Sequence, residues 1–149
     1  MRIVIDEDLR LPLGSKLVRT ARQHPVIVVA AYPPSFDDNT DSAFLGRRAA
    51  LDAAGIEVLQ SHSDEPGELL EALGTRGISS LLVEGGARTA RRFLDADVVD
   101  RILLFQGPAD IGEGGIESPV VKSNIPPSFM HRGESRFGDD RCDEFERGF

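Results

Sequence analysis

The residues with the clearest chemical pattern are Gly85 and Gly86, which lie between an apolar run and a helix-forming run rich in arginine. A strand that leads through two glycines into a helix exposes helix N–H groups at the carboxyl end of that strand. Because glycine has no Cβ atom, the phosphates of a ligand can approach this backbone closely. The pattern therefore favours binding of a phosphorylated ligand.

The helix that follows carries Arg88, Arg91 and Arg92 in a chain that is acidic as a whole. Arg88 falls in the first turn, where the helix dipole is positive, and a bound anion would relieve a mismatch of a few tenths of a kcal/mol up to about 1 kcal/mol. Two other interpretations stay open, because a Gly-Gly pair is often a tight connection and helix arginines are often a solvated face. The spacing also departs from the G-x-G-x-x-G dinucleotide fingerprint.

Glu84 immediately precedes the glycine pair. A carboxylate at the end of a strand can accept hydrogen bonds from the hydroxyl groups of a bound sugar. The alternative is a strand-end carboxylate that lies in water or pairs with an arginine. We favour the ligand-binding role.

Composition limits the classes of function. The 149 residues suit one domain with one core, and a net charge of −8 argues against nucleic-acid binding. No run approaches the roughly 20 apolar residues of a membrane-spanning helix. The single cysteine and the absence of a signal-peptide pattern predict a cytoplasmic protein. The three histidines are widely scattered, so we expect no metal site.

Periodicity predicts alternating strands and helices, and hence a largely parallel sheet with short crossovers. A hairpin turn at residues 138–140 predicts an antiparallel addition at the sheet edge. The expected strands are Arg2–Asp6, His24–Tyr32, Ile56–Leu59, Ile78–Glu84 and Val98–Phe105. The expected helices are Arg47–Ala54, Glu68–Leu73 with Ser63 or Asp64 as its cap, and Ala87–Asp95. The expected irregular segments are Leu9–Leu17, Ser35–Ser42 and Ser118–Ser128.

The run Ser80-Leu81-Leu82-Val83-Glu84-Gly85-Gly86-Ala87 is followed by Phe93-Leu94, Val99-Asp100-Arg101 and Gly112. In this order the residues resemble the reductase domain of the bifunctional riboflavin biosynthesis deaminase–reductase. The resemblance runs from the strand at residues 2–6 to the tail at residues 136–141. It implies a dihydrofolate-reductase-like α/β fold in three layers, with a mostly parallel mixed sheet flanked by helices and a C-terminal antiparallel hairpin.

The resemblance also implies an activity, in which NADPH reduces the sugar of 5-amino-6-(5-phosphoribosylamino)uracil, a small phosphorylated substrate, to its ribityl form. It assigns substrate binding to Glu84. It assigns cofactor binding to Gly85, Gly86, Ala87, Arg88, Thr89, Ala90, Arg91 and Arg92. We leave Glu7 out of the site, because the family commonly has a small polar residue there. We favour residues 112–115 as a wall near the nicotinamide, with a plain loop as the alternative. No general acid can be assigned.

Residues 1–149 are expected to form a single reductase domain from which the N-terminal part is missing. No deaminase domain is expected, because one cysteine cannot supply a Pro-Cys-x-x-Cys zinc site. Two other functions stay open: a non-catalytic remnant or assembly module of the same fold, and a reductase of the same superfamily with another substrate. The family's dimers and an exposed sheet edge make a homodimer the expected assembly.

Overall fold

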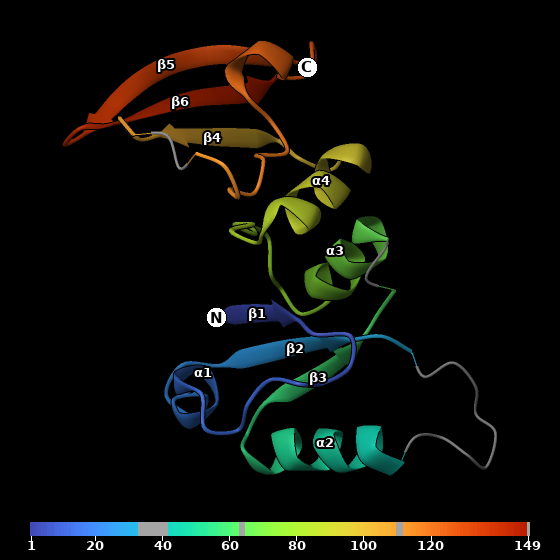
Figure 1. Cartoon of the computed structure of the whole chain (residues 1–149). Coiled ribbons are helices and arrows are strands. Elements are labelled where there is room, and N and C mark those ends of the chain that lie inside the picture. Colours follow the sequence, from blue (N-terminus) through green and yellow to red (C-terminus); the bar gives the residue numbers. More distant parts are fainter. Residues whose placement is uncertain (33–41, 63–64, 110–111, 149) are drawn as a thin grey trace. The chain divides into compact units, whose positions relative to one another are not determined.

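The computed structural model describes residues 1–32, 42–62, 65–109 and 112–148 (Figure 1). Their internal contacts divide the chain into two compact units, Met1–Ser79 and Ser80–Phe149. In chain order the described part of the first unit contains β1 (Arg2–Ile5), α1 (Lys16–Arg19), β2 (Val26–Ala30), α2 (Ser42–Ala53), β3 (Glu57–Gln60) and α3 (Pro66–Gly74). The second contains α4 (Ala87–Asp95), β4 (Arg101–Gln106), the 3-10 helix η1 (Lys122–Asn124), β5 (Phe129–Phe137) and β6 (Asp140–Arg147).

The first unit is organised by a parallel sheet in the order β1-β2-β3. All five residues of β2 are buried, as the unbroken run of β-branched residues predicted for a strand covered on both faces. Figure 1 shows α2 and α3 on opposite sides of this sheet. Val28 of β2 packs in one core cluster with Phe44 and Leu51 of α2, so the α2 face of the sheet is closed by large apolar side chains.

The boundaries of the elements in the first unit largely follow local signals. Gly55 ends α2 with a φ of +85°, the left-handed conformation that was predicted for this stop. The helix itself begins at Ser42, five residues earlier than the sequence pattern indicated, and α1 occupies the end of the segment that was expected to be irregular. The predicted caps Ser63 and Asp64 lie outside the described residues, as does most of the predicted loop at residues 35–42.

The second unit contains an antiparallel sheet in the order β4-β6-β5. The turn between β5 and β6 passes through Gly138, whose φ is +66°, and this confirms the predicted hairpin. One face of the sheet forms a core from Ile102, Phe129 and Phe145, against which Leu94 of α4 packs. The α/β class and the C-terminal hairpin are therefore confirmed, but the strands lie in two three-stranded sheets rather than in one mixed sheet.

The predicted strand at Ile78–Glu84 is wrong. Residues 78–86 belong to no helix or strand, and Leu82 is 71% exposed. A strand requires a neighbour to receive its backbone hydrogen bonds. Within the described residues, β1 pairs only with β2, and β4 pairs only with β6. Residues 78–84 therefore have the apolar pattern of a strand, but they form no backbone hydrogen-bond ladder with a neighbouring strand.

Arg147 fixes the end of β6 to the connection between α4 and β4. Its Nε donates to the carbonyl oxygen of Val99 at 2.9 Å, and its guanidinium lies 2.7 Å from the carboxylate of Asp97 and 5.0 Å from the ring centre of Phe129. Asp97 has a φ of +57°, a conformation that aspartate tolerates better than most residues. These contacts hold the C-terminal end of α4 against the antiparallel sheet.

In the part of the chain that the structure describes, no helix is both long and apolar enough to cross a membrane. Among the same described residues, no group of three or more histidine, cysteine or acidic side chains is arranged so that it could hold a metal ion.

Candidate functional site

The predicted cofactor residues form one continuous stretch, Gly85–Arg92, that leads into α4 and continues through its first six residues. Gly86 is the N-cap residue, and no side chain caps the first N–H groups of the helix. The first intrahelical hydrogen bond runs from the amide of Ala90 to the carbonyl oxygen of Gly86, at 3.2 Å. The amide groups of Ala87, Arg88 and Thr89 precede this bond, so they have no acceptor within the helix and can donate to an anion.

The two glycines of the turn have different roles. A Cβ atom on Gly85 would lie 2.8 Å from Cβ of Thr89, so this position is filled by packing against the helix. A Cβ atom on Gly86 would meet no heavy atom within 4 Å. The sequence interpretation gave both glycines the same role in ligand approach. The structure leaves that role to Gly86, while Gly85 allows the chain to pass close to Thr89.

The arginines of α4 concentrate positive charge beside this turn. Arg88, Arg91 and Arg92 lie within about a third of the helix circumference, given 100° of rotation per residue. Phe93 is 5% exposed and belongs to the opposite, buried side of the helix. The first turn contains no acidic residue, so nothing in that turn offsets the cation at Arg88 at the positive end of the dipole. An anion is the charge that suits this helix end.

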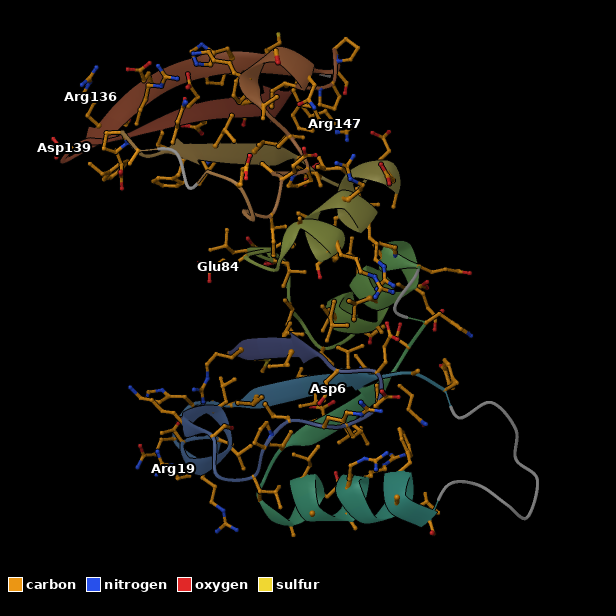
Figure 2. All side chains as sticks on the ribbon, viewed as in Figure 1. Asp6, Arg19, Glu84, Arg136, Asp139 and Arg147 are labelled. Atoms are coloured by element: carbon orange, nitrogen blue, oxygen red, sulfur yellow. The ribbon has the colours of Figure 1, made fainter. Side chains whose placement is uncertain are left out.

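Glu84, the predicted substrate ligand, is exposed and stands two residues before the N-cap (Figure 2). It was expected at the end of a strand, but the segment that carries it forms no ladder. The position of its carboxylate is therefore set by the backbone of the turn and not by pairing within a sheet.

Residues 112–115 form a turn, with φ angles of +78° at Gly112 and +93° at Gly114, values that favour glycine. Their role as a wall stays a prediction.

The carboxylate of Asp143, which the sequence interpretation did not identify, is the most buried charged group among the described residues of the second unit. Only 2% of its side chain is exposed. Lys122 Nζ lies 2.6 Å from Oδ1, His131 Nε2 lies 2.8 Å from the same oxygen, and Arg141 Nε lies 3.2 Å from Oδ2. The hydrogen bond from Lys122, followed by the hydrogen bond from His131 and the charges of Lys122 and Arg141, lowers the pKa of Asp143 from its ordinary value of 3.8, although burial alone would raise it.

This cluster joins η1, β5 and β6, so its first effect is structural. Lys122 comes from the irregular segment, His131 from β5, and Asp143 from the central strand. In the sequence, Asp143 is one of several acidic residues in the tail and shows no feature that separates it from a solvated face. Its position two residues before Phe145, on the same face of β6, becomes informative only once the core-facing side of the strand is known.

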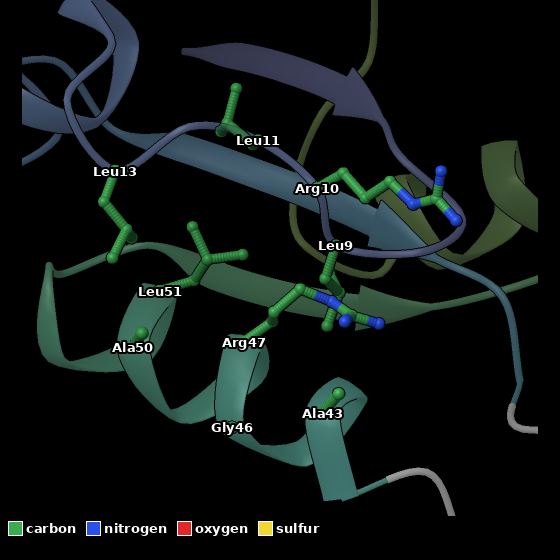
Figure 3. A pocket seen from close by; sticks show the side chains of 9 residues that line it. All are labelled: Leu9, Arg10, Leu11, Leu13, Ala43, Gly46, Arg47, Ala50 and Leu51. Atoms are coloured by element: carbon green, nitrogen blue, oxygen red, sulfur yellow. The ribbon is translucent and has the colours of Figure 1, made fainter.

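The described part of the first unit contains a cavity of about 370 Å³ between the segment after β1 and helix α2 (Figure 3). It is lined by Leu9, Arg10, Leu11, Leu13, Ala43, Gly46, Arg47, Ala50 and Leu51. The guanidinium of Arg47 is engaged there, because its Nε donates to the carbonyl oxygen of Asp8 at 2.8 Å. None of the predicted site residues lines this cavity, and its walls are mainly apolar, so it carries no assigned chemistry.

Comparison with known proteins gives the context for the α4 turn. Residues 1–140 match the family model described as the RibD C-terminal domain. The riboflavin biosynthesis protein RibD of Aquifex aeolicus is 32% identical over 114 residues, which cover 76% of this chain and 29% of that protein. The 2,5-diamino-6-ribosylamino-4(3H)-pyrimidinone 5′-phosphate reductase of Archaeoglobus fulgidus is 28% identical over 121 residues, covering 81% of this chain and 50% of that protein.

Solved structures share the fold at lower sequence identity. A pyrimidine reductase-like protein of Corynebacterium diphtheriae superimposes with a TM-score of 0.75 and 18% identity, over 99% of this chain and 60% of that one. RibD of Acinetobacter baumannii superimposes with a TM-score of 0.72 and 20% identity, over 99% of this chain and 37% of that one. The chain therefore spans half or less of the relatives matched by sequence, and little more than half of the first structural neighbour.

Proposed function

The chain belongs to the RibD C-terminal domain family, and on that premise we propose that it is the cofactor-binding portion of an NADPH-dependent reductase of riboflavin biosynthesis. The observation that carries the proposal is the start of α4, where uncapped amides, an open Gly86 and a cationic first turn meet without an acidic residue. This combination fits the phosphates of a dinucleotide.

Each part of the turn has a task in the proposal. The amides of Ala87 to Thr89 donate hydrogen bonds to the cofactor phosphates, and the arginines of α4 balance their charge. The carboxylate of Glu84 accepts hydrogen bonds from the hydroxyl groups of the substrate sugar. The hydride that opens the ribosyl group into a ribityl chain comes from the bound cofactor, while the protein binds and orients both reactants.

We assign NADPH rather than NADH as the cofactor because the second carries one phosphate fewer. Arg88 and Arg91 are exposed on α4, where they can bind the additional phosphate of NADPH.

The proposed cellular location of the protein is the cytoplasm, and the proposed assembly is a homodimer.

The primary substrate in this proposal is 5-amino-6-(5-phosphoribosylamino)uracil. A second candidate is favoured by the relative from Archaeoglobus fulgidus, whose name places a 2,5-diaminopyrimidinone in the substrate. The two compounds share the ribose phosphate and differ in the pyrimidine ring, so the same α4 turn and the same Glu84 serve either one. A non-catalytic assembly module of this fold is the remaining candidate.

A fluorescence titration tests the proposal. NADPH added to the purified protein should show enhanced nicotinamide emission, and Gly86→Val should abolish this enhancement because the added side chain occupies the open side of the turn. Arg19→Gln, at an exposed arginine of the first unit, is the matched control and should bind as the wild type does. Absence of binding at millimolar NADPH, or unchanged binding by Gly86→Val, would overturn the phosphate role of the turn.

Turnover then separates the enzyme from the assembly module. Each of the two pyrimidine substrates is mixed with protein and NADPH, and the loss of nicotinamide absorbance is followed. Reduction of one substrate identifies it. Cofactor binding without reduction of either compound would favour the non-catalytic alternative for this chain.

A further inference from the structure

The cavity beside helix α2 has no task in the proposed reductase reaction. Its volume of about 370 Å³ falls within the range of about 300–1,000 Å³ that is typical of small-molecule sites. Seven of its nine lining residues are apolar or glycine, and the other two are Arg10 and Arg47. None of the nine is acidic, although the chain as a whole has a net charge of −8. The lining therefore suits a small, mainly apolar molecule that carries a negative charge.

The two guanidinium groups lie close together at one end of the cavity. Arg10 Nη2 lies 3.2 Å from the carboxylate of Asp8, and Arg47 Nε donates to the carbonyl oxygen of the same residue at 2.8 Å. Figure 3 shows both groups toward the end of the cavity where α2 begins, and Leu13 and Leu51 toward the opposite end. A ligand with its charge at one end and its apolar part at the other matches this arrangement.

The ion pair between Arg10 and Asp8 can give way to a competing anion. The two side chains are 78% and 61% exposed, and an exposed pair of this kind contributes little to stability. The carboxylate of a ligand can therefore replace Asp8 at the Arg10 guanidinium at small cost, while the apolar part of the ligand leaves water.

One wall of the cavity is held in place by hydrogen bonds within the chain. Leu9 is 1% exposed and has a φ of +57°, a conformation that is rare for leucine. Its amide donates to the carbonyl oxygen of Asp6 at 3.1 Å, and the amide of Leu11 donates to Oδ2 of Asp6 at 2.6 Å. The wall is thus formed before a ligand binds, which lowers the cost of binding.

Gly46 keeps the α2 side of the cavity open. It lies inside the helix, where glycine is less favourable than every residue except proline. Packing does not require a glycine there, because an added Cβ atom would meet no heavy atom of the described residues within 4 Å. Its backbone is helical, so the conformational freedom of glycine is not needed either. What this glycine provides is space in the lining of the cavity.

We propose that this cavity binds a small aliphatic carboxylate, with the carboxylate at Arg10 and Arg47 and the chain along the leucines and Gly46. Inorganic phosphate or a free sugar does not fit, because its polar groups would lose water against apolar walls without gaining partners. An amine would meet two cations and no acidic residue in the lining. A protein partner would need roughly 20–30 residues on each side, far more than line this cavity.

Isothermal titration calorimetry with sodium octanoate tests the proposal. The wild type should bind one equivalent, and octanamide, which has the same chain and a neutral head group, should bind at least about tenfold more weakly. Arg10→Gln should weaken octanoate binding about tenfold, whereas Arg19→Gln, at an exposed arginine of α1, should leave it unchanged. An absence of saturable octanoate binding up to about 10 mM, or equal binding of octanoate and octanamide, overturns the proposal.

Filling the cavity tests the location of the site. Gly46→Leu places a side chain in the lining and should abolish octanoate binding, while leucine in place of glycine favours the helix. Gly67→Leu is the matched control, because Gly67 also lies in a helix with no heavy atom of the described residues within 4 Å of an added Cβ, but does not line the cavity. It should bind octanoate as the wild type does. Octanoate binding that survives Gly46→Leu refutes this location.

A second measurement keeps the location testable if Gly46→Leu fails to fold. Octanoate added to the wild type should shift the NMR amide signals of residues 9–13 and 43–51 and leave those of α4 unchanged. Shifts confined to the second unit, or scattered over both units, would contradict the site. The predicted cofactor residues 85–92 belong to the second unit, so this inference does not rest on the reductase function and can fail without it.

Discussion

Lys122 Nζ lies 2.6 Å from Oδ1 of Asp143, and this contact joins the 3-10 helix η1 to the central strand of the antiparallel sheet. The side chain of Asp143 is almost fully buried, while the side chain of Lys122 is about half exposed. A buried charge that loses its partner is costly, because water cannot replace the lost interaction. We therefore expect Lys122→Met to lower the midpoint of urea unfolding, measured by circular dichroism, and more strongly than Arg136→Met at an exposed arginine of β5. Equal midpoints for the two variants would show that the contact contributes nothing.

The same carboxylate predicts an acid-sensitive stability. Its pKa is lower in the folded protein than its ordinary value of 3.8, so the folded state favours the ionised form. The stabilisation is therefore present above pH 3.8 and is lost as the pH falls through the folded pKa. The difference in unfolding midpoint between the wild type and Asp143→Asn should be large at pH 7 and shrink steadily below about pH 4. A difference that stays constant from pH 7 to pH 3 would contradict this assignment.

The glycine pair before α4 should respond unequally to alanine. Gly85→Ala places a methyl group 2.8 Å from Cβ of Thr89 and should cost about 1–3 kcal/mol in the free energy of unfolding. Gly86→Ala meets open space at a φ of −59° and should change that free energy by no more than about 0.5 kcal/mol. Urea denaturation of the wild type and of both variants measures the two changes in the free energy of unfolding. If Gly86→Ala proves the more destabilising, the division of roles between these glycines is wrong.

The arginines of α4 should set the preference for the phosphorylated cofactor. Arg88→Gln and Arg91→Gln each remove a charged donor, and a lost charge-assisted hydrogen bond weakens binding about 10- to 100-fold. We expect at least one of these substitutions to weaken NADPH much more than NADH, with Arg19→Gln as the neutral control. Titration with both cofactors by fluorescence measures the ratio. If the substitutions weaken the binding of NADPH and of NADH to the same extent, these arginines contact the phosphates that both cofactors carry.

Cys142 should be unreactive in the native protein. Burial, with the nearby carboxylates of Glu144 and Asp143, raises the pKa of its thiol above 9.0. Only the thiolate attacks disulfide reagents, so labelling at pH 8 should be on the order of 100-fold slower in the folded protein than in urea. A colorimetric thiol assay in both states measures this. Rapid labelling of the folded protein would mean that the central strand opens easily.

Local patterns predicted several elements well. Helix α4 begins at Ala87 and ends at Asp95 as the sequence indicated, because the glycine pair and the amphipathic pattern are both local signals. The buried strand β2 and the turn at Gly138 were also predicted correctly, because each depends on residues that are adjacent in the sequence. The family resemblance, which rests on ordered matches around the same turn, also follows from residues adjacent in sequence.

The sequence by itself thus determined the α/β class, the buried run of β2 and the helix that begins after Gly86. Only the tertiary structure decided which strands share a sheet, that residues 78–84 form no ladder, and that Lys122 meets Asp143. The reason is physical: a helix satisfies its backbone within one segment, whereas a strand or a buried charge depends on partners that are distant along the chain.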